Sequence, residues 1–291
     1  MIKVAIVGFG NIGRAAYEAV MQSADFSLEC IVETAQISAN VPVIKDVSQL
    51  KNIDVAILCL PSRAVPEVAA TLLAKGISTV DSFDIHTRIA DVRKELDKVA
   101  KENSCAAITA AGWDPGSDSI IRALFMAMLP KGITFTDFGP GMSMGHTVAV
   151  KSKEGVKDAL SMTIPLGSGV HRRMVYVELL QGADFAEVSK AIKEDDYFAH
   201  DETHVMQVES VDKLRDSGHG VSLSRKGVSG TTNNQRLEFN MSINNPPLTG
   251  QILVSAARAV TKQTPGCYTM IQIPPIDYLA GDIDSLVREL V

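Results

Sequence analysis

The sequence has no apolar run that approaches the roughly 18 to 20 residues needed to cross a bilayer. It also lacks an excess of basic residues. Its formal net charge is −6 at pH 7, whereas proteins that grip a phosphate backbone non-specifically are usually basic. With 46% hydrophobic and 21% charged residues, the composition is typical of a soluble globular protein. We therefore expect no membrane and no nucleic-acid partner, and 291 residues leave room for two hydrophobic cores.

Cysteine is scarce, and the four cysteines form no CxxC pair. They lie far apart in apolar contexts, which indicates buried free thiols in a reducing cytoplasm. His171, His200 and His204 show no metal-ligand spacing with acids or cysteines, so we expect no metal. At the N-terminus, one lysine and a short β-branched run that ends in glycines predict a buried strand rather than a signal peptide.

Apolar strands alternate with helical segments through the first third of the chain. Continuous apolar strands between helices indicate a parallel sheet covered on both faces, and right-handed crossovers make such a sheet doubly wound. Further along, residues alternate as in half-exposed strands, interrupted by two helical segments, Phe185 to Lys193 and Val211 to Asp216. We predict an α/β protein with a doubly wound domain at 1–118, a second α+β domain with a mostly antiparallel sheet at 119–248, and a segment 249–291 that packs back on the first domain.

A glycine motif, Gly8-Phe9-Gly10-Asn11-Ile12-Gly13, fits GxGxxG and lies between a predicted strand and a predicted helix. A bound pyrophosphate requires a tight turn at Gly8, no side chain at Gly10 and close helix packing at Gly13. The context therefore favours a Rossmann-type dinucleotide-binding domain over a purely structural turn. The expected cofactor contacts in this motif are Gly8, Gly10, Asn11, Ile12 and Gly13.

Glu33 ends the second predicted strand, 20 residues after Gly13. A carboxylate at this position accepts hydrogen bonds from the adenosine ribose hydroxyls and repels a 2′-phosphate. No arginine or lysine lies between Arg14 and Lys45, so this loop offers no evident clamp for NADP. The residues thus favour NAD, with Glu33 and Thr34 at the ribose. The alternative is that Glu33 is a solvated strand end.

Three further motifs follow predicted strands: Asp81-Ser82-Phe83-Asp84-Ile85-His86, Ala111-Gly112-Trp113-Asp114-Pro115-Gly116 and Phe138-Gly139-Pro140-Gly141-Met142-Ser143-Met144-Gly145-His146. Together with the glycine motif, the segment Gly169 to Tyr176 and Asn244-Asn245-Pro246, they resemble the meso-diaminopimelate dehydrogenase family. The resemblance runs in order across nearly the whole chain. It is closest to the branch of that family that also accepts other D-amino acids and 2-keto acids.

The resemblance implies oxidative deamination of the D-centre of meso-2,6-diaminopimelate to L-2-amino-6-oxopimelate and ammonia. It also implies the reverse reductive amination, on the way to lysine and peptidoglycan precursors. Members of the family are typically homodimers that use NADP. This chain departs from them after the second strand, where Glu33-Thr34-Ala35 stands in place of the family's arginines. NAD(H) and NADP(H) therefore both stay open as the cofactor.

Asp84 and Asp114 each follow the end of a predicted strand, where a doubly wound sheet has its ligand crevice. Two carboxylates near one site suit a substrate ammonium. One of them, or a water that it holds, can accept the proton that the amine must lose before hydride leaves the carbon. If both are partly buried and close together, the pKa of one should rise. The alternative for Asp114 is helix capping, because it precedes Pro115.

Substrate carboxylates need donors, and the planar fork of Arg173 suits one. The resemblance places Thr163, Arg173, His219 and Asn245 around the substrate, chiefly at its distal L-centre, with Met144 and Gly145 against it. We add Trp113 and Phe138 to the candidate substrate-binding residues. The remaining candidate cofactor contacts are Leu60, Pro61, Ser62, Arg63, Ser82, Phe83, Gly112 and Pro115. Arg63 and His146 are secondary candidates for the substrate.

Two other interpretations compete with this one. The first is another two-domain reductase, such as a dihydrodipicolinate reductase or a homoserine dehydrogenase. The former normally shows a paired-histidine and lysine motif, and this sequence has no His-His pair. The second is a non-catalytic NAD-binding sensor, which would bind cofactor without turnover. The presence of Asp84, Asp114 and Arg173 disfavours the sensor.

Overall fold

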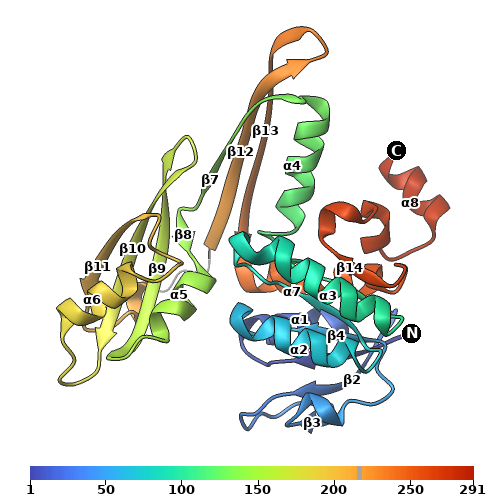
Figure 1. Ribbon diagram of the computed structural model, residues 1–291, viewed down its shortest axis with the longest axis horizontal. Helices are drawn as coiled ribbons and strands as arrows, with labels where there is room; N and C mark the ends of the chain where they lie inside the picture. The colour runs from blue at the N-terminus through green and yellow to red at the C-terminus, as the bar shows by residue number, and fades with distance from the viewer. Residues whose placement is uncertain (215–217) are drawn as a thin grey trace. The chain divides into compact units, whose positions relative to one another are not determined.

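The computed structural model describes residues 1–214 and 218–291, which divide into two compact units (Figure 1). Unit 1 consists of Met1–Ile120 and Pro246–Val291, and unit 2 consists of Ile121–Asn245. The domain boundaries suggested by the sequence, after residues 118 and 248, fall close to these divisions. The C-terminal residues thus belong to the same unit as the N-terminal ones.

Unit 1 contains a seven-stranded sheet in the order β14-β6-β5-β4-β1-β2-β3. Every neighbouring pair of strands is parallel. The strand order reverses between β1 and β4, and doubly wound sheets bind their ligands at such a point. The strands are β1 (Ile2–Val7), β2 (Phe26–Val32), β3 (Val43–Ile44), β4 (Val55–Leu58), β5 (Ser78–Asp81), β6 (Ala106–Ile108) and β14 (Gly266–Tyr268).

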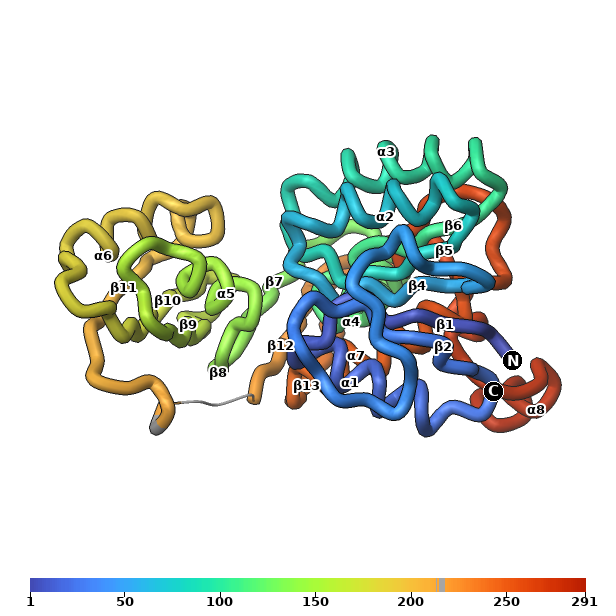
Figure 2. Tube along the Cα trace, turned by 90° about the horizontal axis from the view of Figure 1, so that it is seen from below, coloured from blue at the N-terminus to red at the C-terminus, as the bar shows by residue number. Residues whose placement is uncertain are grey.

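Helices cover both faces of this sheet, as Figure 2 shows for α2 and α3 on one side and α1 and α7 on the other. Two separate apolar clusters result, one for each face. The central strands are buried on both sides, and this is why they consist of continuous apolar residues. The helices are α1 (Asn11–Met21), α2 (Val65–Leu73), α3 (Ile89–Glu102), α7 (Asn245–Val260) and α8 (Ile283–Leu290).

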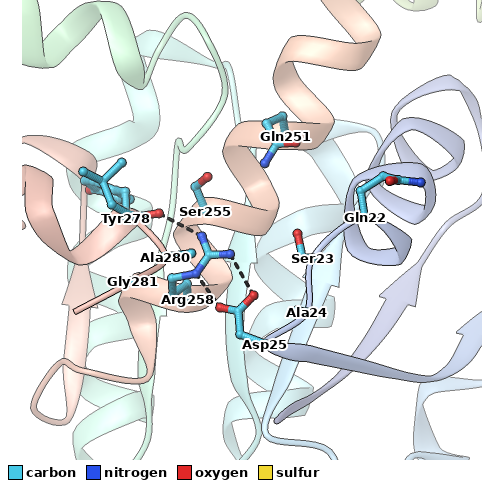
Figure 3. Close-up of a pocket in the computed structure, with 11 residues that line it drawn as sticks. Gln22, Ser23, Ala24, Asp25, Gln251, Ser255, Arg258, Tyr278, Ala280 and Gly281 are labelled. Carbon is cyan, nitrogen blue, oxygen red and sulfur yellow. Dashed lines mark hydrogen bonds and ion pairs between the residues drawn. The ribbon is translucent and has the colours of Figure 1, made fainter. Parts of the chain in front are cut away.

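The C-terminal segment is fixed to unit 1 by pairing and by close helix packing. β14 adds a parallel strand beside β6. Helix α7 packs closely on α1 at Gly250, where a Cβ would lie 2.7 Å from the backbone of Ala15 and Ala16. Arg258 of α7 donates two hydrogen bonds to Asp25, of 2.5 and 3.0 Å, and one to the carbonyl of Tyr278 (Figure 3). These three residues line an open cavity of about 680 Å³ that contains none of the predicted site residues.

Unit 2 contains two sheets. The four-stranded sheet has the order β11-β10-β9-β8 and is antiparallel except for the parallel pair β10 and β11. The three-stranded sheet, β13-β12-β7, is antiparallel throughout. The strands are β7 (Lys131–Phe138), β8 (Gly141–Met142), β9 (Val156–Gly167), β10 (Val170–Leu179), β11 (Glu202–Gln207), β12 (Gly218–Ser229) and β13 (Thr232–Asn244).

The helices of this region are α4 (Ser117–Met128), which crosses the unit boundary, α5 (Met144–Lys151) and α6 (Phe185–Lys193). The last two contribute to one apolar core together with β9 and β10. The predicted fold class, a Rossmann-type doubly wound domain and a mostly antiparallel second domain, is confirmed. The predicted helix Val211 to Asp216 is wrong as far as the structure describes it, because only a 3₁₀ turn forms at Asp212–Leu214 and residues 215 and 216 lie outside the described chain. Among the described residues, no helix is long and apolar enough to span a membrane.

Candidate functional site

The glycine motif connects β1 to α1 and leaves its middle glycine open. Gly8 has φ +90°, and a Cβ there would lie 2.5 Å from the carbonyl oxygen of Cys59. A Cβ on Gly13 would collide with the carbonyl oxygen of Gly8. Around Gly10, by contrast, nothing lies within 4 Å of a Cβ position. The first N–H groups of α1 can therefore be approached by an anion, so the residues present fit a dinucleotide pyrophosphate.

Glu33 lies beside this motif rather than extending into solvent. One carboxylate oxygen accepts the Phe9 N–H at 2.8 Å, and the other accepts the Ala35 N–H at 2.9 Å. These two backbone N–H groups hold the pKa of the Glu33 carboxyl below its usual range. The carboxylate is therefore ionised at neutral pH, next to the loop where the adenosine ribose of a dinucleotide lies in this fold.

A lysine that sequence analysis did not connect with this loop lies against it. Lys45 Nζ donates to the carbonyls of Thr34 and Ala35, at 2.9 and 2.8 Å. Arg14, at the other end of the cation-free stretch, donates from Nε to the carbonyl of Phe9 at 3.4 Å. Both cations that bracket the stretch thus reach the loops around Glu33. Only the folded arrangement of β1, β2 and β3 reveals this.

Two candidate residues, Ser62 and Asp84, are joined directly. Ser62 Oγ donates to Asp84 Oδ1 at 2.6 Å and accepts the Asp84 N–H at 3.1 Å. They are 22 residues apart, but they follow the neighbouring parallel strands β4 and β5. The carboxyl ends of parallel neighbours meet at one edge of the sheet, and this brings the two together.

Asp81, at the end of β5, ties together the two loops that carry Asp84 and Asp114. Its fully buried Oδ1 accepts hydrogen bonds from Phe83 N, Ala110 N and Thr109 Oγ1, at 2.9, 3.1 and 2.9 Å. Oδ2 has no partner among the described residues. Burial raises the pKa of this carboxyl to about 6 against those hydrogen bonds. Asp81 is therefore a buried carboxyl group with a raised pKa. Sequence analysis assigned no role to this residue.

Asp114 belongs to a tight turn that precedes α4. The turn closes through the Gly112 N–H, which donates to the carbonyl of Pro115 at 3.0 Å. A Cβ on Gly116 would collide with the carbonyl oxygen of Gly112, so the glycine at this position is required. Helix α4 begins at Ser117, three residues after Asp114. Trp113 is buried beside Asp114, and the choice between a catalytic and a capping role for Asp114 stays a prediction.

In unit 2, Thr163 of β9 and Arg173 of β10 are direct cross-strand partners. Arg173 Nη1 donates to the Thr163 hydroxyl, and Nε donates to Asp201 Oδ2 at 2.6 Å. Thr163 is buried, and the Arg173 side chain is 12% exposed. Two of the predicted distal-site residues are thus in contact. A third partner, Asp201, was not predicted.

Three histidines lie within the electrostatic influence of Arg173. Burial, and then the nearby guanidinium charge, lowers the pKa of His146 to about 3 and also lowers that of His171. Burial lowers the pKa of His219 as well, and Arg173 contributes to the shift. All three imidazoles are therefore neutral at pH 7. His219 Nδ1 lies 2.7 Å from the Gly220 backbone nitrogen and 3.1 Å from the Gly220 carbonyl oxygen.

The other candidates of unit 2 lie on neighbouring elements. Met144 and Gly145 begin α5, next to His146, whose Nδ1 lies 2.7 Å from Ser143 Oγ. The Phe138 N–H donates to His171 Nε2 at 2.7 Å. Asn245 follows β13 and starts α7. Contacts of these residues with a ligand remain predictions.

Comparison with known proteins identifies the family. The model of the diaminopimelic acid dehydrogenase C-terminal domain matches residues 112–170, and a CoA binding domain model matches residues 1–84. The meso-diaminopimelate D-dehydrogenase of Bacteroides fragilis is 58% identical over 100% of this chain and 99% of its own length. That of Ureibacillus thermosphaericus is 34% identical over 94% of each chain. This chain belongs to the meso-diaminopimelate dehydrogenase family.

Solved structures agree with this family assignment. The DAP dehydrogenase of C. glutamicum in complex with DAP matches with a TM-score of 0.91 and 28% identity, over 100% of this chain and 99% of the other. An engineered D-amino acid dehydrogenase bound to NADP+ matches with a TM-score of 0.92 and 27% identity over the same shares. A dipicolinate-bound dihydrodipicolinate reductase gives 0.53 at 13% identity, which shows a shared fold alone. The resemblance carried by the sequence motifs is confirmed.

Sequence analysis did not assign a role to three polar side chains near the predicted site residues: Asp81, Asp201 and Lys45. Each forms hydrogen bonds with residues that are close in space and distant in sequence. The only available signal for Asp81 was a carboxylate at the buried end of an apolar strand. For Asp201 and Lys45 the sequence offers no local signal.

Proposed function

We propose that this protein oxidises the D-centre of meso-2,6-diaminopimelate with a nicotinamide cofactor. The products are L-2-amino-6-oxopimelate, ammonia and reduced cofactor, and the reverse reaction is a reductive amination. The observation that carries this proposal is the 58% identity to the Bacteroides fragilis dehydrogenase along the whole chain. Other D-amino acids and 2-keto acids are further candidate substrates.

Asp84 and Asp114 are the residues that we assign to the D-centre. A bound nicotinamide supplies the hydride acceptor. The substrate ammonium must lose its proton before hydride can leave the carbon, and one of the two carboxylates accepts that proton. Hydride loss leaves an imine, which water hydrolyses to the ketone and ammonia. Ser62 supports this role for Asp84, because its two hydrogen bonds fix the carboxylate and its backbone.

Arg173 and Thr163 are the residues that we assign to the distal carboxylate. The guanidinium is permanently charged, and His146 and His171 near it are neutral at pH 7 and add no positive charge of their own. His219 and Asn245 complete the set of polar groups that we assign to the distal centre. We assign Met144, Gly145, Trp113 and Phe138 to the walls of the substrate site.

For the cofactor, we propose a preference for NAD over NADP. The Glu33 carboxylate is ionised and positioned by Phe9 and Ala35, which suits ribose hydroxyls and opposes a 2′-phosphate. Lys45 offers a compensating cation nearby, but both of its described hydrogen bonds go to backbone carbonyls. The proposed contacts with the rest of the cofactor are Gly8, Gly10, Asn11, Ile12, Gly13, Thr34, Leu60, Pro61, Ser62, Arg63, Ser82, Phe83, Gly112 and Pro115.

We also propose that the protein is a homodimer in the cytoplasm. Large apolar side chains of α4 and β7 are exposed in unit 2, namely Leu124, Met126, Met128, Ile133 and Phe135. Exposed apolar groups of this size, gathered on neighbouring segments, are typical of protein interfaces. All four cysteines carry free thiols, which suits a reducing compartment.

The function is tested by initial rates at alkaline pH with meso-, D,D- and L,L-diaminopimelate, each with NAD and with NADP. We expect reduction of the nicotinamide with the isomers that contain a D-centre and none with the L,L-isomer. D-Alanine has a D-centre but no distal group. The ratio of kcat/KM for meso-diaminopimelate to that for D-alanine therefore measures how much the distal group contributes to specificity. Cofactor binding without turnover of any isomer would instead support the sensor interpretation.

A further inference from the structure

Two consecutive arginines on β10 pair with two consecutive acids, Asp201 just before β11 and Glu202 at its first position. Arg172 pairs with Glu202, and Arg173 pairs with Asp201. Successive side chains on a strand point to opposite faces, so the two pairs lie on different sides of the four-stranded sheet. The side chains of the first pair are 39% and 46% exposed, and those of the second are 12% and 27% exposed.

The two pairs differ in how completely they are closed. Arg172 and Glu202 form a bidentate pair, with Nε–Oε1 at 2.9 Å and Nη2–Oε2 at 3.1 Å. Arg173 meets Asp201 only through Nε and Oδ2, and its Nη1 turns to Thr163. Among the described residues, Nη2 of Arg173 and Oδ1 of Asp201 take part in no hydrogen bond. The more buried pair therefore keeps one donor, Nη2, and one acceptor, Oδ1, for a ligand.

Two hydrogen bonds hold the backbone of Asp201 next to β11. The Asp201 N–H donates to the carbonyl of Phe198 at 3.1 Å. The hydroxyl of Thr203 donates to the carbonyl of Asp201 at 3.1 Å. Thr203 is in turn the register partner of Arg173 in the parallel pair of β10 and β11. The sheet and these two hydrogen bonds thus fix the backbone from which each side chain of the pair extends.

The Arg173–Asp201 pair presents one positive and one negative charge, and the nearby histidines add no further charge. His146, His171 and His219 are neutral at pH 7, because burial and the Arg173 charge lower their pKa values. A lone carboxylate ligand would be attracted by Arg173 and repelled by Asp201. A zwitterionic α-amino-acid group offers a carboxylate to the first and an ammonium to the second. Each of its two charges can then pair with an opposite and partly buried charge of the protein.

We propose that Arg173 and Asp201 together bind the distal α-amino-acid group of the substrate, with Arg173 on its carboxylate and Asp201 on its ammonium. This inference rests on the proposed function, because it assigns Asp201 to the same substrate. It makes Asp201 the residue that selects substrates with an amino group at the far end over plain dicarboxylates.

The test compares meso-diaminopimelate with D-2-aminopimelate, which has the same D-centre and distal carboxylate but no distal amino group. We expect Asp201→Asn to lower kcat/KM for meso-diaminopimelate about tenfold or more, as for a lost hydrogen bond to a charged group. For D-2-aminopimelate, kcat/KM should stay the same or rise. Glu202→Gln, which alters the neighbouring bidentate pair on the other face, is the matched control and should leave the preference unchanged.

Equal losses for both substrates would overturn the proposal, because Asp201 would then only orient Arg173. An unchanged preference in Asp201→Asn would overturn it as well. The same comparison is made by calorimetric binding of both compounds to the cofactor-loaded protein. If the wild-type protein binds them but turns neither over, the proposed function fails, while the ratio of the two binding constants in wild type and Asp201→Asn still decides the role of Asp201.

Discussion

Ser62 and Asp84 exchange two hydrogen bonds across the ends of two neighbouring parallel strands. The serine hydroxyl donates to the carboxylate at 2.6 Å and accepts the backbone N–H of the same aspartate at 3.1 Å. One small side chain therefore fixes both the loop and the rotamer of the carboxylate. A candidate cofactor contact and a candidate catalytic residue are coupled in this way.

We expect Ser62→Ala to lower kcat about tenfold or more, because Asp84 loses a charge-assisted hydrogen bond. Folding stability should change little, because Ser62 is only partly buried. Ser23→Ala, which removes a hydroxyl bonded only to a helix carbonyl of unit 1, serves as the control and should keep full activity. Steady-state rates and melting temperatures decide the matter, and unchanged kcat in Ser62→Ala would argue against Asp84 at the D-centre.

Asp114→Asn should reduce kcat by about 100-fold if this carboxylate takes part in proton transfer. The turn itself is closed by backbone hydrogen bonds and glycines, so the melting temperature should hardly move. The measurement is kcat and thermal unfolding on the same preparations. A rate loss that follows the loss of melting temperature would assign Asp114 a structural role.

Glu33→Arg should shift cofactor preference toward NADP, because it removes the ribose acceptor and adds a cation for the 2′-phosphate. We expect the ratio of kcat/KM for NADP to that for NAD to rise about tenfold or more, as for the gain of a charged hydrogen bond. Glu29→Arg makes the same charge change at an exposed position of β2, the strand that precedes Glu33. If both variants leave the ratio as in the wild type, Glu33 does not contact the ribose.

Asp81 should make stability depend on pH in the opposite sense to a salt-bridged aspartate. Its pKa is about 6 in the folded protein, against an ordinary 3.8, so the folded state holds the proton more tightly than the unfolded chain does. This contribution is complete below about pH 4 and is lost as the pH rises through about 6.

Between pH 7.5 and pH 4.5, wild type should therefore gain about 2 kcal/mol of unfolding free energy relative to Asp81→Asn. Taking the difference between the two proteins removes the contributions of all other groups. Thr79→Val, a buried change on the same strand without a titratable group, should show a pH-independent offset. Parallel pH curves for wild type and Asp81→Asn would mean that Asp81 titrates normally.

Leu124→Glu should convert the proposed dimer to a monomer, because it places a charge among the exposed apolar side chains of α4. Met21→Glu introduces the same charge at an exposed apolar position of unit 1 and should leave the mass unchanged. Light scattering after size-exclusion chromatography gives the mass directly. A monomeric wild type, or a dimeric Leu124→Glu, would remove this face from consideration.

Much of the fold follows from local sequence patterns. The helix Phe185 to Lys193 has the bounds that the sequence pattern predicts, and the structure adds its cap, the Asp184 carboxylate, which accepts the N–H groups of Ala186 and Glu187. The parallel strands of unit 1 were predicted because burial on both faces requires continuous apolar residues. Where local preference and tertiary burial agree, the sequence suffices.

The rest depends on contacts that no local pattern contains. Helix α5 was missed because it starts in a glycine-rich motif, and Gly145 disfavours a helix there. The three-residue strand β14 is stabilised by its neighbour β6 rather than by its own composition. The same reason hides Asp201 and Lys45, whose partners lie on other strands.

The most direct test of the proposed reaction follows deuterium from the substrate to the cofactor. With meso-diaminopimelate deuterated only at the D-centre carbon, we predict that the label appears on the reduced nicotinamide. With the label only at the L-centre, the reduced cofactor should stay unlabelled. Label transferred from the L-centre, or none transferred from the D-centre during turnover, would contradict the account.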